Sequence, residues 1–255
     1  MRENKGSCIA IGNFDGIHVG HNILIRKMID LSTENNLDSI IITFEYVKND
    51  LRKSSSNMKY INSPSRKLKI LKSYKVSRVV EIQLNDVISK YTPEEFIKLL
   101  VYEYNAKNIV VGYNFRFGHK ASGNISTLMN FQDKYGYKVE EIYPVKHQGI
   151  AISSTLVRNL LKEGKIREAN KLLVNKYTLY HEELNFDYNK NMAFVDNKSS
   201  ILVPSDGKYL VNIGSKELIL TITSNEKGAS LIFNNKLEEN ADIVFVDKLS
   251  KQTNF

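Results

Sequence analysis

Two histidines three residues apart are the first residues in this sequence whose spacing suggests chemistry. His18 and His21 stand in the run Gly12-Asn13-Phe14-Asp15-Gly16-Ile17-His18-Val19-Gly20-His21, between an apolar stretch and a helical pattern. Side chains three apart at a helix start point the same way, and the helix N-terminus attracts anions. We interpret the run as a polyphosphate site in which both imidazoles donate hydrogen bonds. A pair of ordinary surface histidines is the competing interpretation.

A second candidate is the run Ile152-Ser153-Ser154-Thr155-Leu156-Val157-Arg158. Three consecutive hydroxyls at a helix start cap the helix, and that interpretation needs no ligand. Arg158 follows one turn after Ser154 and Thr155, so hydroxyls, free N–H groups and a guanidinium could also converge on one anion. Together with the histidine pair, the run predicts a second set of groups that binds the same triphosphate.

A third candidate is the run Val110-Val111-Gly112-Tyr113-Asn114-Phe115-Arg116-Phe117-Gly118, at the end of a predicted strand. In open parallel sheets, ligands bind at the carboxyl ends of the strands. Two phenylalanines flanking Arg116 would offer an aromatic wall and a cation to a planar ring that bears a phosphate. The alternative is that both phenylalanines are core residues and that Arg116 is a surface residue.

The elements around these runs alternate between strand and helix. Apolar strands separated by helices predict a doubly wound parallel sheet, so the fold class is α/β. Thr92-Pro93-Glu94-Glu95 predicts a capping box with proline in the first turn of its helix. The predicted strands are residues 7–11, 38–44, 78–82, 107–112 and 137–142, and the predicted helices are 21–35, from 64, 93 to about 104, 126–134 and 166–174.

The sequence pattern changes near Lys176, where short β-type runs separated by turns begin. They predict a small antiparallel β-barrel as a second domain, so the expected domains are residues 1–175 and 176–255. Residues 176–255 carry a net charge of −2, against +10 for residues 1–175, which hold all eight arginines. A basic first domain suggests an anionic ligand. The predicted runs are 177–181, 192–195, 200–203, 208–213, 218–223, 229–233 and 242–246.

The composition narrows the class of protein. Apolar residues make up 42% and charged residues 25% of the 255, as in ordinary globular proteins. No apolar run approaches the ~20 residues that span a bilayer, and no nucleic-acid-binding motif occurs. A single cysteine, Cys8, and five scattered histidines argue against disulfides and structural zinc. We therefore expect a cytoplasmic protein with no membrane and no nucleic-acid partner.

Residues from about Cys8 to Tyr177 resemble the prokaryotic FAD synthetase family, usually a bifunctional riboflavin kinase/FMN adenylyltransferase. The segments that carry the resemblance are IGNFDGIHVGH, ITFE, YTPEEFI, VVGYNFRFGHKASG and ISSTLVRNLLKEGKIREANKLL. The resemblance implies a Rossmann-like nucleotidylyltransferase fold. It also implies transfer of AMP from ATP to FMN, which gives FAD and pyrophosphate, with Mg²⁺ bound mainly by ATP.

The same resemblance implies roles for individual residues. Its catalytic residues would be His18, His21 and Arg158. The ATP-binding residues would be Gly12, Asn13, Phe14, Gly16, Gly20, Ser153, Ser154 and Thr155. The flavin-binding residues would be Asn114, Arg116 and Phe117. No protein metal ligand is implied.

The sequence departs from the family pattern in two places. Glu45 is followed by Tyr46-Val47-Lys48 where the family has Pro-His-Pro. The Gly-rich turn and the Phe-Pro-Thr-Ala-Asn segment of the family's kinase domain have no match after Tyr177. We therefore expect an FMN adenylyltransferase whose shortened C-terminal domain lacks kinase activity and could support self-association. The alternatives are a nucleotidylyltransferase for another phosphorylated acceptor and a non-catalytic flavin- or nucleotide-binding protein.

Overall fold

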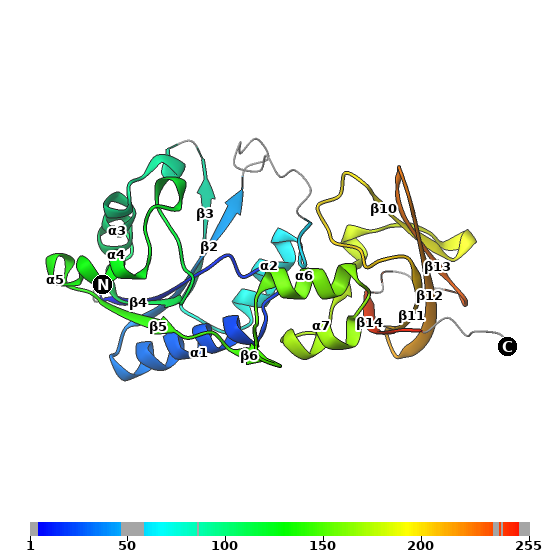
Figure 1. Ribbon diagram of the computed structural model, residues 1–255, viewed down its shortest axis with the longest axis horizontal. Helices are drawn as coiled ribbons and strands as arrows, with labels where there is room; N and C mark the ends of the chain where they lie inside the picture. Colours follow the sequence, from blue (N-terminus) through cyan, green and yellow to red (C-terminus); the bar gives the residue numbers. More distant parts are fainter. Residues whose placement is uncertain (1–4, 47–58, 86, 237–239, 241, 250–255) are drawn as a thin grey trace. The chain divides into compact units, whose positions relative to one another are not determined.

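The computed structural model of the chain describes residues 5–46, 59–85, 87–236, 240 and 242–249 (Figure 1). Contacts divide these residues into two compact units. Unit 1 is formed by the described parts of Met1–Phe14, Gly20–Ser56 and Pro64–Ala151. Unit 2 is formed by the described parts of Asp15–Val19, Asn57–Ser63 and Ile152–Phe255. Since this division follows contacts and not function, the predicted domain boundary between residues 175 and 176 stays a prediction.

Unit 1 is built on a five-stranded sheet in the order β3-β2-β1-β4-β5, and all its strand pairs are parallel. The order reverses between β1 and β4, and this switch point is where open α/β sheets bind ligands. The predicted doubly wound sheet is thereby confirmed. Its strands are β1 (Ser7–Ile11), β2 (Asp38–Tyr46), β3 (Arg78–Leu84), β4 (Ala106–Gly112) and β5 (Lys138–Ile142).

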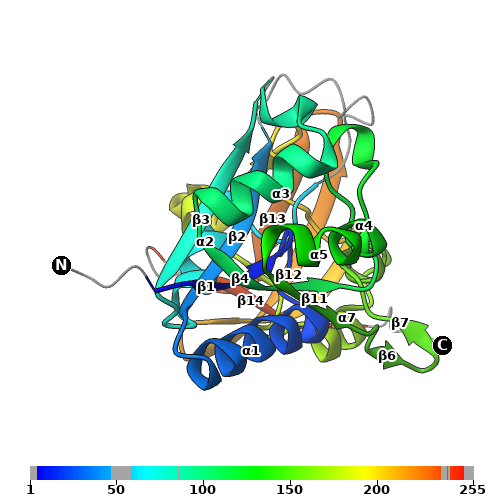
Figure 2. The same cartoon turned by 90° about the vertical axis from the view of Figure 1, so that its left-hand side faces the viewer.

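Helices lie on both sides of this sheet, with α1 and α3 on opposite sides (Figure 2). The predicted capping box of α3 is present: the Glu95 N–H donates to the Thr92 hydroxyl, and the Glu95 carboxylate accepts from the Thr92 N–H. The helices of this part of the chain are α1 (Val19–Glu34), α2 (Pro64–Lys72), α3 (Pro93–Tyr102), α4 (Ile125–Asn130) and α5 (Gln132–Tyr135), with 3-10 turns η2 (Ile88–Lys90) and η3 (His119–Ala121).

Two local features differ from the expected pattern. The helix predicted over residues 126–134 is broken at Phe131, whose φ of −99° and ψ of 1° leave the helical region. A short hairpin of β6 (Lys146–His147) and β7 (Ile150–Ala151) was not predicted. Both are short elements whose periodicity is too brief to read from sequence.

The core of unit 1 is filled from both faces of the sheet, since β1 is buried along its whole length. Successive strand side chains alternate between faces, so Ile9 and Ile11 join the cluster that includes Phe96 and Leu100 of α3. Cys8 points to the other face and is completely buried. A strand that is apolar on both faces is what the sequence run predicted.

The buried thiol of Cys8 is expected to be inert in the folded protein. Burial, aided by the negative charge of Glu140, raises its pKa to about 12, so the reactive thiolate is scarce at neutral pH. A chromogenic disulfide reagent should therefore release less than one tenth of an equivalent during an hour with the native chain at neutral pH. The same reagent should titrate one thiol per chain in denaturant. Fast stoichiometric reaction of the native chain would contradict the buried placement.

Unit 2 combines two helices with a seven-stranded antiparallel sheet. The sheet runs in the order β8-β14-β11-β12-β13-β10-β9 and forms a half-barrel, which confirms the predicted antiparallel β domain. Its helices are α6 (Ser154–Lys162) and α7 (Ile166–Leu172), with 3-10 turns η4 (His181–Glu183) and η5 (Tyr188–Lys190). Its strands are β8 (Thr178–Leu179), β9 (Asn185–Asp187), β10 (Met192–Asp196), β11 (Gly207–Ile213), β12 (Lys216–Asn225), β13 (Gly228–Phe233) and β14 (Ile243–Lys248).

One predicted run of this domain is not a strand of the sheet. Residues 200–203 form only a single parallel bridge, from Ile201 to Tyr60, a residue 141 positions earlier in the chain. Because its partner is remote in sequence, this pairing carries no local signal.

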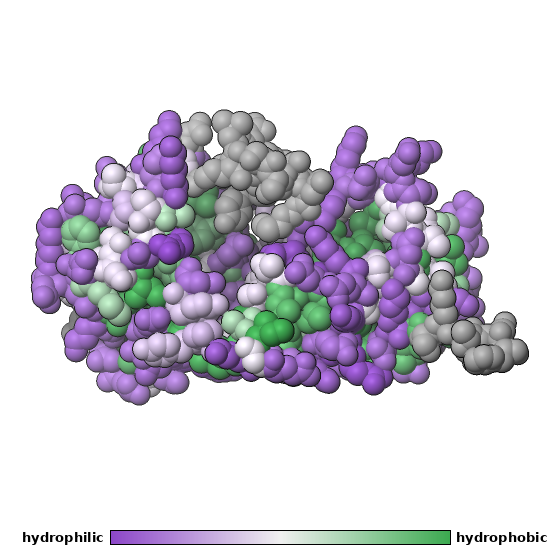
Figure 3. Space-filling model, in the orientation of Figure 1, coloured by the Kyte–Doolittle hydropathy of each residue, from purple (hydrophilic) through white to green (hydrophobic). Residues whose placement is uncertain are grey.

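One face of the molecule is mostly polar. Hydrophilic side chains cover most of the face drawn in Figure 3, with smaller hydrophobic groups between them. In the part of the chain that the structure describes, each helix is too short or too polar to cross a membrane.

Candidate active site

The loop that follows β1 begins in unit 1 with a tightly fixed backbone. The Gly12 N–H donates to the Ile42 carbonyl (3.1 Å), and the Thr43 hydroxyl donates to the Asn13 carbonyl (3.2 Å). Phe14 is buried with a positive φ of 52°. A Cβ on Gly12 would lie 3.1 Å from the Phe14 ring, so glycine leaves room for that ring. The first residues of the predicted nucleotide loop therefore have a strained backbone that hydrogen bonds and packing hold in place.

His21 lies in the first turn of α1 and is half-buried. Its imidazole meets the edge of the Phe14 ring, with ring centroids 5.2 Å apart at an interplanar angle of 66°. Phe14 thus orients the histidine that the sequence singled out. The loop and the first turn of α1 are thus joined by the contact between the Phe14 ring and the His21 imidazole.

The second half of the loop belongs to unit 2, where Asp15 is the central residue. Asp15 is 3% exposed, and its carboxylate accepts hydrogen bonds from the Ile61 N–H (3.0 Å) and the Asn62 N–H (3.2 Å). The Arg158 guanidinium donates to the same carboxylate at 3.0 Å. Burial raises the pKa of Asp15, while these donors act against the rise. The sequence run contained this residue, but its role was not predicted.

His18 is 6% exposed, so it is a buried residue and not the exposed imidazole of the surface interpretation. It forms an antiparallel bridge with Leu173, and the Val174 N–H donates to the Ile17 carbonyl at 3.1 Å. Burial lowers the pKa of His18 to about 4. At neutral pH the imidazole is therefore uncharged, and it can act as a neutral hydrogen-bond donor rather than as a cation.

The lowered pKa of His18 predicts acid sensitivity. Between about pH 6.5 and 4 the unfolded chain binds a proton at His18 that the folded chain does not, so the free energy of unfolding falls as the pH falls. The loss should approach about 3 kcal/mol on the order-of-magnitude scale of 1.36 kcal/mol per pKa unit. Denaturant unfolding at pH 7, 6 and 5 measures it. The His18→Gln variant should lack this part of the decline, and an identical decline in both proteins would contradict the assignment.

Helix α6 begins at the predicted run of hydroxyls. Ser153 is its N-cap and accepts a hydrogen bond from the Leu156 N–H (3.2 Å), which confirms the capping interpretation for this residue. The Ser154 hydroxyl donates to the Asp15 carbonyl (2.8 Å), and Thr155 is exposed. The sequence therefore placed the helix start correctly, while two of its side chains already have partners inside the protein.

Arg158 is 8% exposed and pairs with Asp15. The sequence predicted a guanidinium directed at an anionic ligand; in the structure one of its terminal nitrogens already bonds a buried carboxylate. Within the described residues, the Arg158 Nε is buried with no hydrogen-bond partner. The structure brings Ser154 and Arg158 to the loop that carries His18, because both bond Asp15.

The segment after β4 lies at the other side of the switch point. Asn114 and Arg116 are exposed, as a ligand-binding role requires. Phe117 is 6% exposed and packs in the core, with its ring centroid 5.4 Å from that of Phe96 and 5.5 Å from that of Phe115. Phe117 therefore has the core position of the alternative interpretation, and any contribution to a flavin site would come from packing beneath it.

Of the two departures from the family pattern, the first continues into residues 47–58, which lie outside the described residues. The second is the lack of a match to the kinase segments after Tyr177, a region that includes β10 and the residue that follows it, Asn197. Asn197 bonds the turn between β12 and β13, donating from its backbone to the Lys227 carbonyl (2.9 Å) and from its side chain to the Glu226 carbonyl (3.2 Å). The backbone and side-chain N–H donors of Asn197 are thus engaged within the domain.

Sheet order and loop geometry define a Rossmann-like α/β protein with a candidate site at the carboxyl ends of β1 and β4. The chain belongs to the FAD synthetase family, whose model matches residues 1–156. It is 35% identical over 178 residues to the bifunctional riboflavin kinase/FMN adenylyltransferase of Buchnera aphidicola subsp. Schizaphis graminum, a match that covers 69% of this chain and 57% of that protein. The chain thus spans little more than half the length of this relative.

Two further similarities extend over most of the chain. The FAD synthetase of Listeria monocytogenes is 24% identical over 224 residues, which are 88% of this chain and 87% of that protein. A solved structure described as a macrolide-efflux protein from Streptococcus pneumoniae is 22% identical, with a TM-score of 0.78, and covers 99% of this chain and 89% of its own. This structural likeness concerns the fold alone.

Proposed function

We propose that the protein is an FMN adenylyltransferase. The observation that carries the proposal is the match to the FAD synthetase family over residues 1–156, which contain the loop with His18 and His21 and the start of α6. The buried and strained geometry of that loop supports it, because conformations of this kind cluster at functional sites. ATP and FMN would be the substrates, and a cytoplasmic location fits their use.

In the proposed reaction, a phosphate oxygen of FMN attacks the α-phosphorus of ATP. A new P–O bond forms, the bond between the α-phosphorus and the bridging oxygen breaks, and pyrophosphate leaves with the electron pair. FAD and pyrophosphate are the products. No protein nucleophile takes part, so catalysis consists of positioning and stabilisation of developing charge.

The histidines and the start of α6 would stabilise this charge. His18, neutral at pH 7, and His21 would donate hydrogen bonds to phosphate oxygens. Arg158 would reach the leaving pyrophosphate only with the N–H groups that Asp15 does not use, such as Nε–H. The nucleotide would also contact Gly12, Asn13, Gly16, Gly20, Ser153, Ser154 and Thr155, and the buried Phe14 would contribute by packing beneath the loop. Flavin would contact Asn114 and Arg116, above Phe117.

Mg²⁺ would enter as part of the Mg·ATP substrate. Among the described residues, no three His, Cys, Asp or Glu side chains gather closely enough to form a metal-binding group. Phosphate oxygens are suitable ligands for this hard cation, which keeps several waters when it binds to nucleotides. The ion would neutralise charge on the phosphates while the protein donors orient them.

We further propose that the C-terminal domain has no riboflavin kinase activity. Residues 177–203 contain no glycine, so the backbone there has no position that easily approaches phosphates. The net charge of −2 over residues 176–255 opposes ATP binding. The polar atoms of Asn197 support the same proposal, since they already bond the turn at Glu226 and Lys227.

One assay tests both proposals. The purified chain is incubated with Mg·ATP and either riboflavin or FMN, and the flavins are separated by chromatography. We expect FAD from FMN and no FMN from riboflavin. Absence of FAD from FMN would contradict the transferase proposal. Accumulation of FMN from riboflavin by the His18→Ala variant, in which FAD synthesis is blocked, would contradict the second proposal.

A second candidate function is adenylyl transfer to another phosphorylated acceptor, favoured by the altered sequence after Glu45. Pyrophosphate release separates the two. It should require FMN under the first proposal and a different phosphorylated compound under the second. Tight binding of FMN or ATP without any pyrophosphate release would indicate a non-catalytic binding protein.

A further inference from the structure

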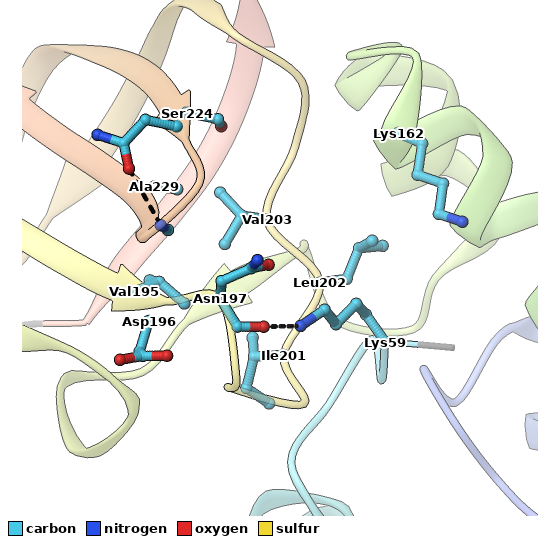
Figure 4. A pocket seen from close by; sticks show the side chains of 12 residues that line it. Lys59, Lys162, Val195, Asp196, Asn197, Ile201, Leu202, Val203, Ser224 and Ala229 are labelled. Carbon is cyan, nitrogen blue, oxygen red and sulfur yellow. Dashed lines mark hydrogen bonds between the residues drawn. The ribbon is translucent and has the colours of Figure 1, made fainter. Parts of the chain in front are cut away.

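The short segment Lys59–Ser63, called the strap below, lies between β2 and α2 in sequence and bonds partners in unit 2. Its first residue reaches the loop after β10. The Lys59 Nζ donates to the Asn197 carbonyl (2.7 Å) and to the Ser199 carbonyl. Figure 4 shows the Lys59 amine turned toward Asn197, at the rim of a cavity of about 230 Å³. Its charge is thereby used to hold backbone carbonyls.

The next residue continues the attachment through its backbone. The Tyr60 N–H donates to the Ser200 carbonyl (2.6 Å), and the Leu202 N–H donates to the Tyr60 carbonyl (2.9 Å). These two bonds form the parallel bridge between Tyr60 and Ile201. The strap therefore pairs with the β domain like one residue of an added strand.

The end of the strap meets the buried carboxylate of Asp15. The backbone N–H groups of Ile61 and Asn62 both donate to it, and Ser63 hydrogen-bonds Glu183. A Cβ on Gly16 would lie 2.7 Å from an Ile61 side-chain carbon, so the strap also packs closely on the loop. One connected set of bonds thus runs from the β domain to the loop that carries His18.

The loop needs such support because its backbone is strained. Gly16 has a φ of 75°, and Ile17, a β-branched residue, has a φ of 26°. Conformations of this kind persist only where the surroundings over-determine them. The restraints on this part of the loop include the bonds of Asp15 to the strap, Ser154 and Arg158, and the bond from Val174 to Ile17.

We propose that the strap is the means by which the C-terminal β domain positions His18 for adenylyl transfer, with Asp15 as the positioning residue at the junction. This inference rests on the proposed function. It gives the β domain a role in the reaction that requires no chemistry of its own. Asp15 acts through His18 and does not touch the substrate.

The expected effect follows from the geometry of phosphoryl transfer. A misplacement of about 1 Å costs about 10²-fold in rate, and loosening one end of the strap should cost part of that. The Lys59→Met variant keeps the length of the side chain but removes its charge and donors. We expect its kcat to fall about ten-fold, with the KM for ATP changed less than two-fold, since the ATP contacts remain.

Two variants make this test specific. Lys59→Arg retains donors for the carbonyls of Asn197 and Ser199, so it should restore kcat to within about two-fold of wild type. Lys198→Met makes the same substitution at an exposed lysine between these two acceptors and should leave kcat unchanged. Wild-type kcat in a folded Lys59→Met protein, or an equal loss in Lys198→Met, would overturn the proposal.

Hydrogen exchange separates failure of this inference from failure of the proposed function. In Lys59→Met, peptides that cover residues 15–19 and 60–62 should exchange at least five-fold faster than in wild type, while Lys198→Met should match wild type. This readout needs no substrate. If wild type makes no FAD, the proposed function fails alone, and faster exchange still supports the structural coupling. Unchanged exchange at residues 15–19 would overturn the coupling whatever the activity.

Discussion

Replacing His18 with alanine is expected to slow FAD formation by about 10²–10³-fold, the usual effect of removing one donor to developing charge. The same loss is expected for His21→Ala. The two imidazoles differ in setting: His18 is buried and uncharged at neutral pH, whereas His21 is half-buried against Phe14. Each would donate to phosphate oxygens of the proposed transition state, so kcat should fall more than KM rises.

The burial of His18 calls for a control on folding. His18→Gln keeps an N–H donor and much of the volume, so it should recover part of the rate that His18→Ala loses. His147→Ala, on the β6 strand, is a matched histidine deletion outside the candidate site and should keep wild-type kinetics. Initial rates of FAD formation, with thermal unfolding of each variant, make the comparison. Full FAD synthesis by a His18→Ala, His21→Ala double variant would contradict both assignments.

Replacing Arg158 with alanine is expected to lower the free energy of unfolding by about 3–5 kcal/mol. The reason is that Asp15, 3% exposed, would lose the cation that compensates its buried charge. Denaturant unfolding measures the loss. The double variant Asp15→Asn, Arg158→Met removes both charges and should regain a large part of it. A loss below about 1 kcal/mol for Arg158→Ala would mean that the pair is not buried as described.

The same variant tests the proposed role of Arg158 in catalysis. Below its unfolding temperature, Arg158→Ala should lose about 2–4 kcal/mol in kcat/KM with ATP as the varied substrate, typical of a lost charge-assisted contact to phosphate. Arg158→Lys keeps a cation for Asp15 but not the fork of donors, so it should be more stable than alanine and still impaired. Unchanged kinetics in both variants would leave the start of α6 with its capping role alone.

Sequence patterns predicted the parts of the fold whose signals are local. Strand β1 is buried at every position and apolar from Cys8 to Ile11, and α3 carries its capping box and proline within four residues. The alternation of strands and helices predicted the doubly wound parallel sheet, and the histidine loop follows its strand β1. Each of these features is fixed by residues close together in the chain, which is why their pattern was sufficient.

The remaining features depend on partners far apart in sequence. Asp15 bonds Ile61 and Arg158, which are 46 and 143 residues away, so no local pattern indicates that it joins three segments. Tyr60 pairs with Ile201 in the same way. Phe117 was predicted to contact a planar ligand ring because it is aromatic, but packing against Phe96 places it in the core. Local residue types do not reveal which of two apolar environments a side chain enters.

The burial of the only cysteine has a practical consequence for spectroscopy. Since Cys8 is the single thiol and is buried within β1, thiol-reactive labels should not attach to the unmodified folded chain. An exposed position on each unit, such as Tyr143 in unit 1 and Lys198 in unit 2, could be changed to cysteine without competition from a native thiol. Fluorophores or spin labels at that pair would report the separation of the two units before and after addition of the proposed substrates, Mg·ATP and FMN, in otherwise native protein.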